Sequence, residues 1–257
     1  MDASLIQKSA VPLKLDTRQV GKRIGLILLA TDHTTERDFA RMCPHHRAAV
    51  YANRIFNENP TTPENLRRMQ PRLTDGAALI LPEEQLDVIY YSCTSASAVL
   101  GNDAVVGTVN RAKPATPVIT PTSAADAALR TLGARRISIL TPYIPETSAA
   151  VAEYFAGQGY DVVNLSCFGM EDDREMARVS LETIFEAGCQ TLAADADALF
   201  ISCTALPSAE VAQRIETATG KPVVTSNQAG VWLALRTIDI DDPLGGYGRL
   251  LTLSPTP

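Results

Sequence analysis

An internal repeat limits the architectures open to this chain of 257 residues more than any other property of its sequence. Three segments of the first half return in the same order, each about 110 residues further along: RIGLIL at 23–28 as RISIL at 136–140, DVIYYSCT at 87–94 as DALFISCT at 197–204, and PVIT at 117–120 as PVVT at 222–225. A common order at a nearly constant offset is hard to obtain by chance. The repeat therefore predicts two homologous lobes of about 110 residues each.

Short apolar runs rich in β-branched residues alternate with longer helical stretches in both halves. We expect strands at 24–29, 50–56, 87–91, 117–119, 136–140, 161–165, 198–202 and 222–225. We expect helices at 36–43, 62–75, 95–101, 122–132, 147–158, 173–194, 207–219 and 227–237. Strands joined by crossover helices form parallel sheets. The fold class is therefore α/β, with two pseudo-symmetric lobes that are flavodoxin-like or Rossmann-like.

The lobe boundaries follow from the two places where the chain is expected to pass from one lobe to the other, near 117–122 and 222–228. The N-terminal lobe is expected to hold residues 1–118 together with 226–257, whose helix contains Trp232 and returns to this lobe. The C-terminal lobe is expected to hold residues 119–225. Because no low-complexity linker separates the halves, we expect the lobes to pack closely around a shared cleft that contains the active site.

Charge and hydropathy narrow the classes of partner. The chain has 23 Lys and Arg against 29 Asp and Glu, a net charge of −6, and no basic cluster, so nucleic acid is not an expected partner. The longest apolar stretch near the start, residues 24–30, is far shorter than the ~20 residues that span a bilayer. Residues 1–22 show no secretory signal. We therefore expect a cytoplasmic protein without a membrane partner.

The five cysteines include one repeated pair. No CxxC motif is present, so all five are expected to be free thiols. Cys93 and Cys203 each follow a predicted strand and precede small polar residues that can open a helix. Ligands of parallel sheets bind at this carboxyl edge, and the N–H groups there favour a thiolate, which lowers a thiol pKa from about 8.5. Two such sulfurs on opposite lobes suit proton removal on one face of a substrate and return on the other.

The alternative for any single cysteine is packing. A lone cysteine beside a buried strand is usually a small core residue. The repeated Ser-Cys-Thr favours chemistry for Cys93 and Cys203, whereas Cys43, Cys167 and Cys189 have no counterpart and are assigned to packing.

Other motifs carry weaker signals. Residues 34–36 (TTE) fit a helix cap and a ligand contact equally well. His33, His45 and His46 do not have zinc-site spacing, and no glycine-rich phosphate motif follows a strand. We therefore expect neither a metal nor a nucleotide cofactor.

The chain resembles the aspartate/glutamate racemase superfamily, and more closely its maleate isomerase and arylmalonate decarboxylase branch. The resemblance covers nearly the whole chain after residue 22. It rests on TTE at 34–36, SCT at 92–94 and 202–204, TPY at 141–143 and TSNQ at 225–228, among which the paired cysteines are the specific part. Within the branch, TDHTTE at 31–36 is most similar to ectoine-utilisation proteins, which are encoded with ectoine and hydroxyectoine catabolism.

The resemblance implies a cofactor-independent enzyme that acts on a small carboxylate. In maleate isomerases the first cysteine adds to the alkene, the C–C bond rotates, and elimination gives fumarate; in the racemases the two cysteines exchange a proton at Cα. By position, Cys93 is the implied nucleophile or first base and Cys203 the opposite acid. Backbone amides at Thr94, Ser95, Thr204 and Ala205 are the implied carboxylate ligands, with Tyr143 as a further donor.

Two positions depart from the maleate isomerase pattern. That pattern has Asn where this chain has His33, and a second Asn where it has Asp173. An anionic Asp173 repels a second carboxylate, while His33 can supply charge or a proton. These departures favour a substrate with one carboxylate and an amine or amidine, as in ectoine derivatives.

We therefore expect an isomerase or racemase-like enzyme of compatible-solute catabolism. The alternatives are a maleate cis–trans isomerase, an arylmalonate decarboxylase-like enzyme, and a non-catalytic protein that binds small carboxylates. Family habit implies a homodimer or a larger homo-oligomer.

Overall fold

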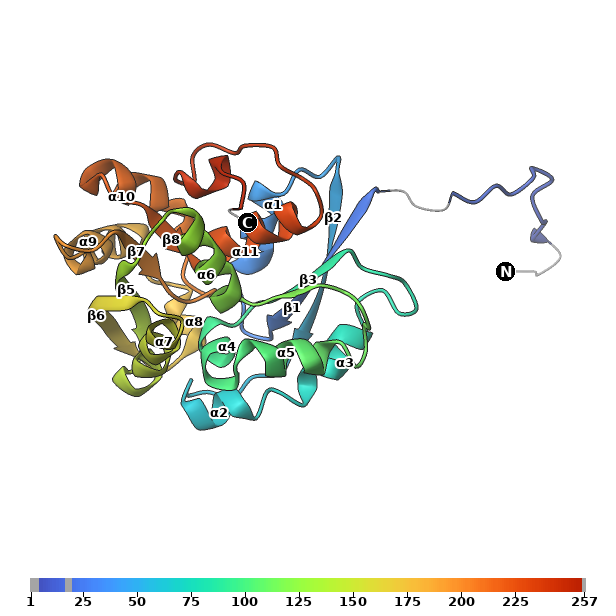
Figure 1. Ribbon diagram of the computed structural model, residues 1–257. Helices are drawn as coiled ribbons and strands as arrows, with labels where there is room; N and C mark the ends of the chain where they lie inside the picture. Colours follow the sequence, from blue (N-terminus) through green and yellow to red (C-terminus); the bar gives the residue numbers. More distant parts are fainter. Residues whose placement is uncertain (1–4, 17–19, 256–257) are drawn as a thin grey trace.

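The computed structural model describes residues 5–16 and 20–255, and within them the strands form two four-stranded parallel sheets (Figure 1). The first sheet has the order β2-β1-β3-β4, with β1 at Lys22–Leu29, β2 at Ala48–Ile55, β3 at Val88–Tyr91 and β4 at Val118–Ile119. The second has the order β6-β5-β7-β8, with β5 at Arg136–Tyr143, β6 at Asp161–Met170, β7 at Ala198–Ile201 and β8 at Val223–Thr225. The equivalent orders confirm the predicted pair of parallel α/β lobes.

The helices follow the strands in both halves. In the first half they are α1 at Thr35–Met42, α2 at Pro63–Arg67, α3 at Arg72–Ala78, α4 at Thr94–Leu100 and α5 at Asn102–Val109. The second half has α6 at Pro121–Thr131, α7 at Pro145–Gly157, α8 at Asp173–Met176, α9 at Leu181–Thr191, α10 at Ala212–Thr219 and α11 at Ser226–Thr237, with short 3₁₀ turns η2 at Ser208–Glu210 and η3 at Leu250–Thr252. Proline is the first residue of α2, α6 and α7. The first N–H groups of a helix have no partner within the helix, so the missing N–H of proline costs no hydrogen bond there.

Two of the expected helices are each divided into two α-helices, and one helix was not predicted. The helix expected at 62–75 is divided into α2 and α3 by the turn before Pro71, and the one expected at 173–194 is divided into α8 and α9, where Ser180 caps α9. Helix α5 was not predicted at all. It begins after Gly101, whose φ of +83° breaks the chain direction and separates α5 from α4.

The pleat of β1 directs its side chains into two different cores. Ile24, Leu26 and Leu28 join the large cluster that also contains the second lobe, whereas Ile27 and Leu29 join a smaller cluster under α2, α3 and α5. One face of the first sheet therefore shares a continuous apolar core with the second lobe. The two lobes are packed together by the same hydrophobic burial that stabilises each of them.

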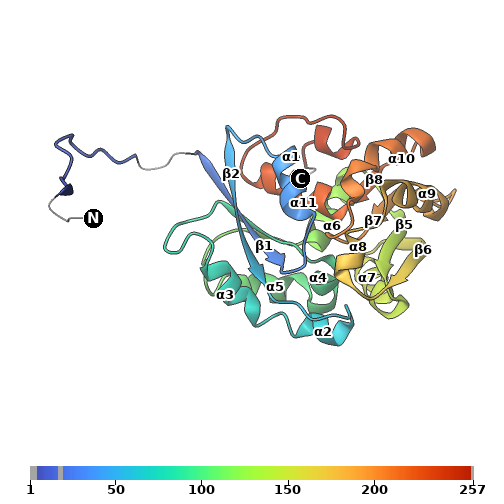
Figure 2. The ribbon, with the colours of Figure 1, turned by 180° about the vertical axis from the view of Figure 1, so that it is seen from behind.

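Helix α11 lies between the two sheets (Figure 2). It contacts α1 and β3 of the first half and α6 and β8 of the second. Trp232 is fully buried and its Nε1 donates to the Leu253 carbonyl at 2.8 Å. A Cβ atom at Gly230 would lie 2.5 Å from the Tyr90 ring, so only glycine permits this close approach. The lobe boundaries at 118/119 and 225/226 stay a prediction.

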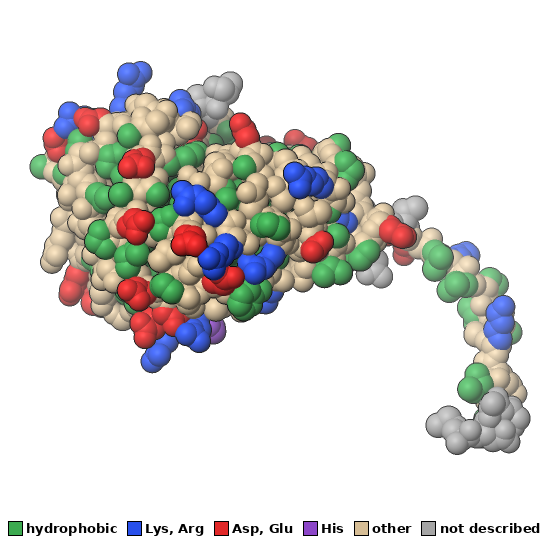
Figure 3. Space-filling view, turned by 90° about the horizontal axis from the view of Figure 1, so that it is seen from below, with side chains coloured by type: hydrophobic (Ala, Val, Ile, Leu, Met, Phe, Trp, Pro, Cys, Tyr) green, Lys and Arg blue, Asp and Glu red, His purple; other side chains and the backbone are tan. Residues whose placement is uncertain are grey.

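Residues 5–16 extend away from the body of the protein (Figure 3). They carry exposed apolar side chains at Leu5, Ile6, Val11, Leu13 and Leu15. The face of the body seen in Figure 3 mixes acidic and basic side chains. No helix within the described ranges has the length and apolar character needed to cross a membrane.

Candidate active site

The two repeated cysteines lie at equivalent ends of central strands. Cys93 follows β3 and Cys203 follows β7, two residues beyond the last strand residue in each case. Both side chains are buried, with Cys93 4% and Cys203 3% exposed. The structure therefore places them at the carboxyl edges of the two sheets, as the repeat predicts.

The backbone differs between the two turns. Cys93 is extended, with φ −157°, and α4 begins at the next residue. Cys203 has φ +102°, a conformation that strains any residue with a Cβ atom, and η2 begins only at Ser208. Strain of this kind persists only where surrounding contacts enforce it. Sequence similarity between the repeats gave no sign of this difference.

Burial dominates the electrostatics of both thiols. It raises the pKa of Cys93 to about 11, although the Ala96 N–H and the Ser95 hydroxyl act in the opposite direction. It also raises the pKa of Cys203, and the Asp173 carboxylate adds to that increase. The expectation of lowered thiol pKa values was wrong for this structure, because desolvation outweighs the N–H groups of the turns.

Two tyrosines accompany the thiols. The hydroxyl of Tyr143 lies 3.3 Å from the Ser202 Oγ and interacts with both thiols. Burial raises the pKa of Tyr143 well above its usual value, so the side chain is a neutral donor. Tyr91 interacts with the Cys93 thiol, and its buried hydroxyl has no oxygen or nitrogen partner among the described residues. Tyr143 was predicted for the site, and Tyr91 was missed.

The residues that follow each cysteine have backbone and side-chain roles. The Ser95 hydroxyl is 3.7 Å from the Cys93 Sγ, and the Ala205 N–H donates to the Cys203 Sγ at 3.3 Å. The hydroxyl of Thr94 donates to the Ser226 Oγ at 2.8 Å, and that of Thr204 to the Ser92 carbonyl at 3.3 Å. Both threonine hydroxyls are thus engaged within the protein.

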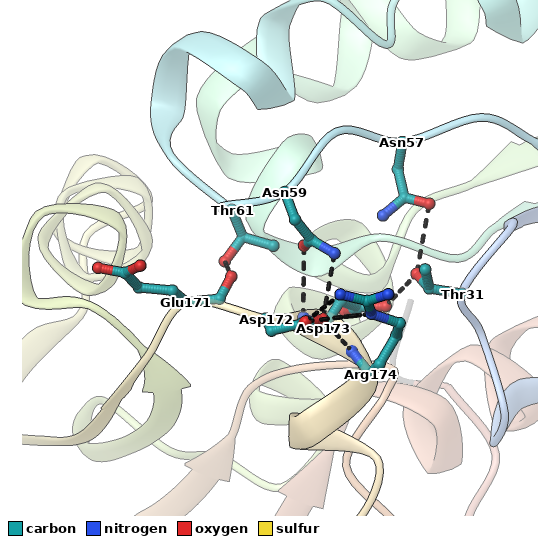
Figure 4. A network of polar contacts seen from close by, with 8 residues as sticks. All are labelled: Thr31, Asn57, Asn59, Thr61, Glu171, Asp172, Asp173 and Arg174. Atoms are coloured by element: carbon teal, nitrogen blue, oxygen red, sulfur yellow. Dashed lines mark hydrogen bonds and ion pairs between the residues drawn. The ribbon is translucent and has the colours of Figure 1, made fainter.

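Asp173 is buried at the start of α8 and faces the first lobe (Figure 4). The hydroxyl of Thr31 donates to its Oδ2 at 2.6 Å. Burial raises the pKa of Asp173 to about 6, and the nearby carboxylate of Asp32 adds to the increase. Asp173 in turn raises the pKa of both thiols, so it lies within electrostatic range of Cys93 and Cys203.

His33 does not join the buried group. Its side chain is exposed, although its charge lowers the pKa of Asp173. The neighbouring Asp32 is the buried residue of this loop: its carboxylate accepts from the N–H groups of Thr34 and Thr35 at 2.8 Å and from the Ser92 hydroxyl at 3.1 Å. The cap at the start of α1 therefore comes from Asp32, a residue to which the sequence analysis gave no role.

Asn57 is a second polar residue that sequence reasoning missed. Its Oδ1 lies 3.3 Å from the Thr31 Oγ1, whose proton goes to Asp173 at the shorter distance, and its buried Nδ2 has no partner among the residues that the structure describes. Figure 4 shows it on the first-lobe side of the Thr31–Asp173 contact. Its position two residues after β2 is the available signal, because polar side chains at the carboxyl edge of a parallel sheet face its ligand site.

Hydrogen bonds join the two lobes beside Asp173 (Figure 4). The N–H of Thr61 donates to the Glu171 carbonyl at 3.0 Å, and the Asn59 Nδ2 donates to the Asp172 Oδ1 at 3.1 Å. These contacts connect the segment between β2 and α2 to the segment before α8. They hold the two lobes together beside the buried Asp173.

The remaining cysteines have different surroundings. Cys43 is buried and Cys189 is half-buried, whereas Cys167 is exposed on the edge strand β6. Packing was therefore the wrong assignment for Cys167, because its side chain faces outward from an edge strand. Within residues 5–16 and 20–255, no group of three or more His, Cys, Asp or Glu side chains is arranged to hold a metal ion.

The fold and the buried cysteine pair define a two-lobed α/β protein with one thiol at the carboxyl edge of each parallel sheet. The chain belongs to the arylmalonate decarboxylase family, whose model matches residues 63–251. A maleate isomerase of Nocardia farcinica is 25% identical over 240 residues, which cover 90% of this chain and 95% of that protein. An arylmalonate decarboxylase of Bordetella bronchiseptica is 31% identical over 137 residues, 52% of this chain and 57% of that protein.

A solved structure shares the fold. It is a variant of the Nocardia farcinica maleate cis–trans isomerase with a covalently bound succinylcysteine intermediate, and it aligns with a TM-score of 0.81 at 24% identity. The alignment covers 90% of this chain and 98% of that one.

Proposed function

We propose that this protein is a cofactor-independent isomerase that uses Cys93 and Cys203 as a pair of acid–base groups on a small carboxylate. The observation that carries the proposal is the placement of two buried thiols at equivalent strand ends, one from each lobe, beside the same Tyr143 and Asp173 side chains. Packing alone does not require two cysteines in matching turns surrounded by the same polar groups.

The proposed reaction exchanges a proton at the carbon next to the carboxylate. The Cys93 thiolate takes the proton, so that an S–H bond forms, the C–H bond breaks, and its electron pair enters an enolate. The Cys203 thiol then donates its proton to the opposite face of that carbon and becomes the thiolate. Backbone N–H groups at Thr94, Ser95 and Thr204 hold the carboxylate oxygens, with the Tyr143 hydroxyl as a further donor. The Ala205 N–H, predicted for the same role, instead donates to the Cys203 Sγ. Each preorganised donor contributes a few kcal/mol to such a transition state.

The substrate is proposed to carry one carboxylate and a cationic nitrogen, as intermediates of ectoine and hydroxyectoine utilisation do. Asp173 supports this, because it is a buried carboxylate near both thiols and it opposes thiolate formation at each of them. A cationic group beside Asp173 would cancel that repulsion and lower both thiol pKa values. His33 is proposed to contact the substrate from the rim of the site, where it is exposed.

Maleate cis–trans isomerisation is the second candidate. It is favoured by the relatives that are maleate isomerases and align with 90% of this chain. In that reaction the Cys93 thiolate would form a C–S bond to one alkene carbon. The C–C bond, now single, would rotate, and the C–S bond would then break to give fumarate and the free thiolate. An arylmalonate decarboxylase-like reaction is a further candidate because of the family membership.

The deciding experiment is NMR of maleate, aspartate, ectoine and hydroxyectoine incubated with the protein in D2O. Deuterium at Cα supports the proton-exchange reaction, fumarate supports the second candidate, and loss of carbon dioxide from an added arylmalonate supports the third. Cys93→Ala and Cys203→Ala should each abolish turnover while the circular dichroism spectrum is retained. Unchanged turnover in both variants would contradict the two-cysteine proposal, and binding without turnover would indicate a non-catalytic protein. Light scattering tests the predicted homo-oligomer.

A further inference from the structure

One buried hydroxyl touches both cysteine turns. The Ser226 Oγ accepts a hydrogen bond from the Thr94 Oγ1 at 2.8 Å and another from the Cys203 N–H at 3.1 Å. Ser226 is fully buried and is the first residue of α11. Thr94 directly follows Cys93, so a single oxygen atom connects the turn of the first lobe to the turn of the second.

The strained turn at Cys203 is held from both sides. Its own N–H is fixed by Ser226, and the carbonyl of the next residue, Thr204, accepts from the Asn227 Nδ2 at 2.9 Å. The Thr204 hydroxyl donates to the carbonyl of Ser92, the residue before Cys93. These bonds explain how a residue other than glycine keeps φ at +102° here.

Ser226 is itself fixed against the first lobe. Its carbonyl accepts from the Tyr90 hydroxyl at 3.1 Å, and Gly230 lets α11 approach the Tyr90 ring closely. Asn227 is tied to α1, because its Nδ2 also donates to the Asp38 Oδ2 at 2.8 Å. The start of α11 is therefore anchored to the strand that leads to Cys93 as well as to the turn that holds Cys203.

We propose that Ser226 is a positioning residue that sets the separation and orientation of the Cys93 and Cys203 thiols. This inference rests on the proposed two-cysteine function. Transfer of a proton or formation of a C–S bond requires sulfur at contact distance from the reacting carbon on each face, and a displacement of about 1 Å reduces such rates by about 100-fold. The Ser226 hydroxyl bonds to the Thr94 hydroxyl and to the Cys203 N–H, and it acts through these two turns.

The test compares Ser226→Ala, which removes both bonds, with Thr94→Val, which removes only the bond from the first lobe at nearly constant volume. Ser138→Ala is the matched control, because Ser138 is a fully buried serine on β5 that likewise accepts a backbone N–H, from Ala193 at 3.0 Å. Turnover of the substrate found by NMR and the separate alkylation rates of Cys93 and Cys203, followed by mass spectrometry, are measured for each variant.

We expect kcat to fall about 100-fold in Ser226→Ala with KM within about threefold of wild type, and less in Thr94→Val. The double variant should be no slower than Ser226→Ala, because both changes remove the same bond. Alkylation of Cys203 should accelerate at least fivefold in Ser226→Ala as its turn relaxes. Ser226→Thr, which keeps the hydroxyl, should restore most of the rate.

The proposal is overturned if Ser226→Ala matches Ser138→Ala within threefold in both kcat and alkylation of Cys203. If Ser226→Ala does not fold, Thr94→Val takes its place, and the proposal is overturned if kcat and the alkylation rate of Cys203 in Thr94→Val match those of Ser138→Ala within threefold. Failure of the two-cysteine function itself is seen separately, as unchanged turnover in Cys93→Ala and Cys203→Ala.

Discussion

The hydroxyl of Thr31 in the first lobe donates a hydrogen bond to the Oδ2 of Asp173 in the second lobe, at 2.6 Å. This contact holds a buried carboxylate near both thiols at the junction between the lobes. The carboxylate of Asp173 raises the pKa of both thiols, so substitution at this position should change their reactivity.

Asp173→Asn should accelerate alkylation of Cys93 and Cys203 at pH 8. Asp173 raises the pKa of both thiols, so removing its charge lowers those pKa values and should increase the thiolate fraction severalfold. Asparagine keeps an oxygen that can accept from Thr31. The same variant should gain turnover of maleate and lose affinity for carboxylates with a cationic nitrogen.

Asp172→Asn is the matched control for that experiment. Asp172 precedes Asp173 in the chain, is paired with Arg174 at the surface, and caps α8 through a bond that asparagine can also make. It removes the same charge from the surface end of α8 and leaves the buried Asp173 carboxylate in place. Equal alkylation rates and equal substrate preference in the two variants would contradict the role given to Asp173.

Asp38 should make the protein less stable as the pH rises. Burial raises its pKa to about 7, from an unfolded value of about 4, so the folded state binds more protons between these values. Its contribution to stability is fully present below about pH 4 and is lost as the pH rises to about 7. Burial also raises the pKa of Asp173, to about 6, so its contribution to stability is likewise lost as the pH rises to about 6.

Urea unfolding at pH 5 and pH 8 measures the effect of Asp38. Asp38→Asn keeps an acceptor for the Asn227 Nδ2 and should reduce the loss of unfolding free energy between the two pH values by about 2 kcal/mol. An equal loss in the variant would show that Asp38 is ionised at little cost in the folded state, and a larger loss would show that folding lowers its pKa.

Gly230→Ala should destabilise the protein by about 3 kcal/mol, at the upper end of the usual range for overpacking. The added Cβ would lie 2.5 Å from the Tyr90 ring, which is fixed by its hydroxyl bond to the Ser226 carbonyl. Gly107→Ala is the control: it is also in a helix, α5, and nothing lies within 4 Å of its added Cβ. That control should gain about 0.5–1 kcal/mol. Thermal unfolding that ranks the two variants in the reverse order would exclude tight packing of α11 on β3.

Cys167 should react first with a thiol reagent under native conditions. It is exposed on β6, whereas Cys43, Cys93 and Cys203 are buried and Cys189 is half-buried. Cys167→Ser should remove the fastest phase of a reaction with dithionitrobenzoate and leave the slow phases unchanged. A fast phase that survives this substitution would mean that the half-buried Cys189 or one of the buried thiols is as reactive as Cys167.

Much of the fold could be predicted because local pattern and topology agree. The apolar runs that lead to Cys93 and Cys203 mark the central strands, and parallel topology puts their carboxyl ends at a ligand edge. The helix division at Pro71 and the separate α5 were missed because helix boundaries depend on single residues.

The network around the thiols could not be predicted in the same way. Thr94 and Ser226 are bonded across 132 residues, and Thr31 and Asp173 across 142, so these contacts depend on how the lobes dock. The N–H groups that follow each strand favour a thiolate, and this local effect predicts lowered pKa values for both thiols. Burial, which is a property of the whole fold, outweighs that effect.

The unequal backbone of the two cysteine turns has a kinetic consequence. Cys93 is extended and Cys203 has φ +102°, so a duplicated sequence supports two thiols that are not interchangeable. In the proposed reaction one thiol serves each face of the substrate carbon, and the forward and reverse directions begin from different sulfurs. In a racemisation the equilibrium constant is 1, so kcat/KM is the same in both directions and a difference in kcat must be balanced by a matching difference in KM. A racemising enzyme built this way would handle mirror-image substrates with visibly different saturation curves.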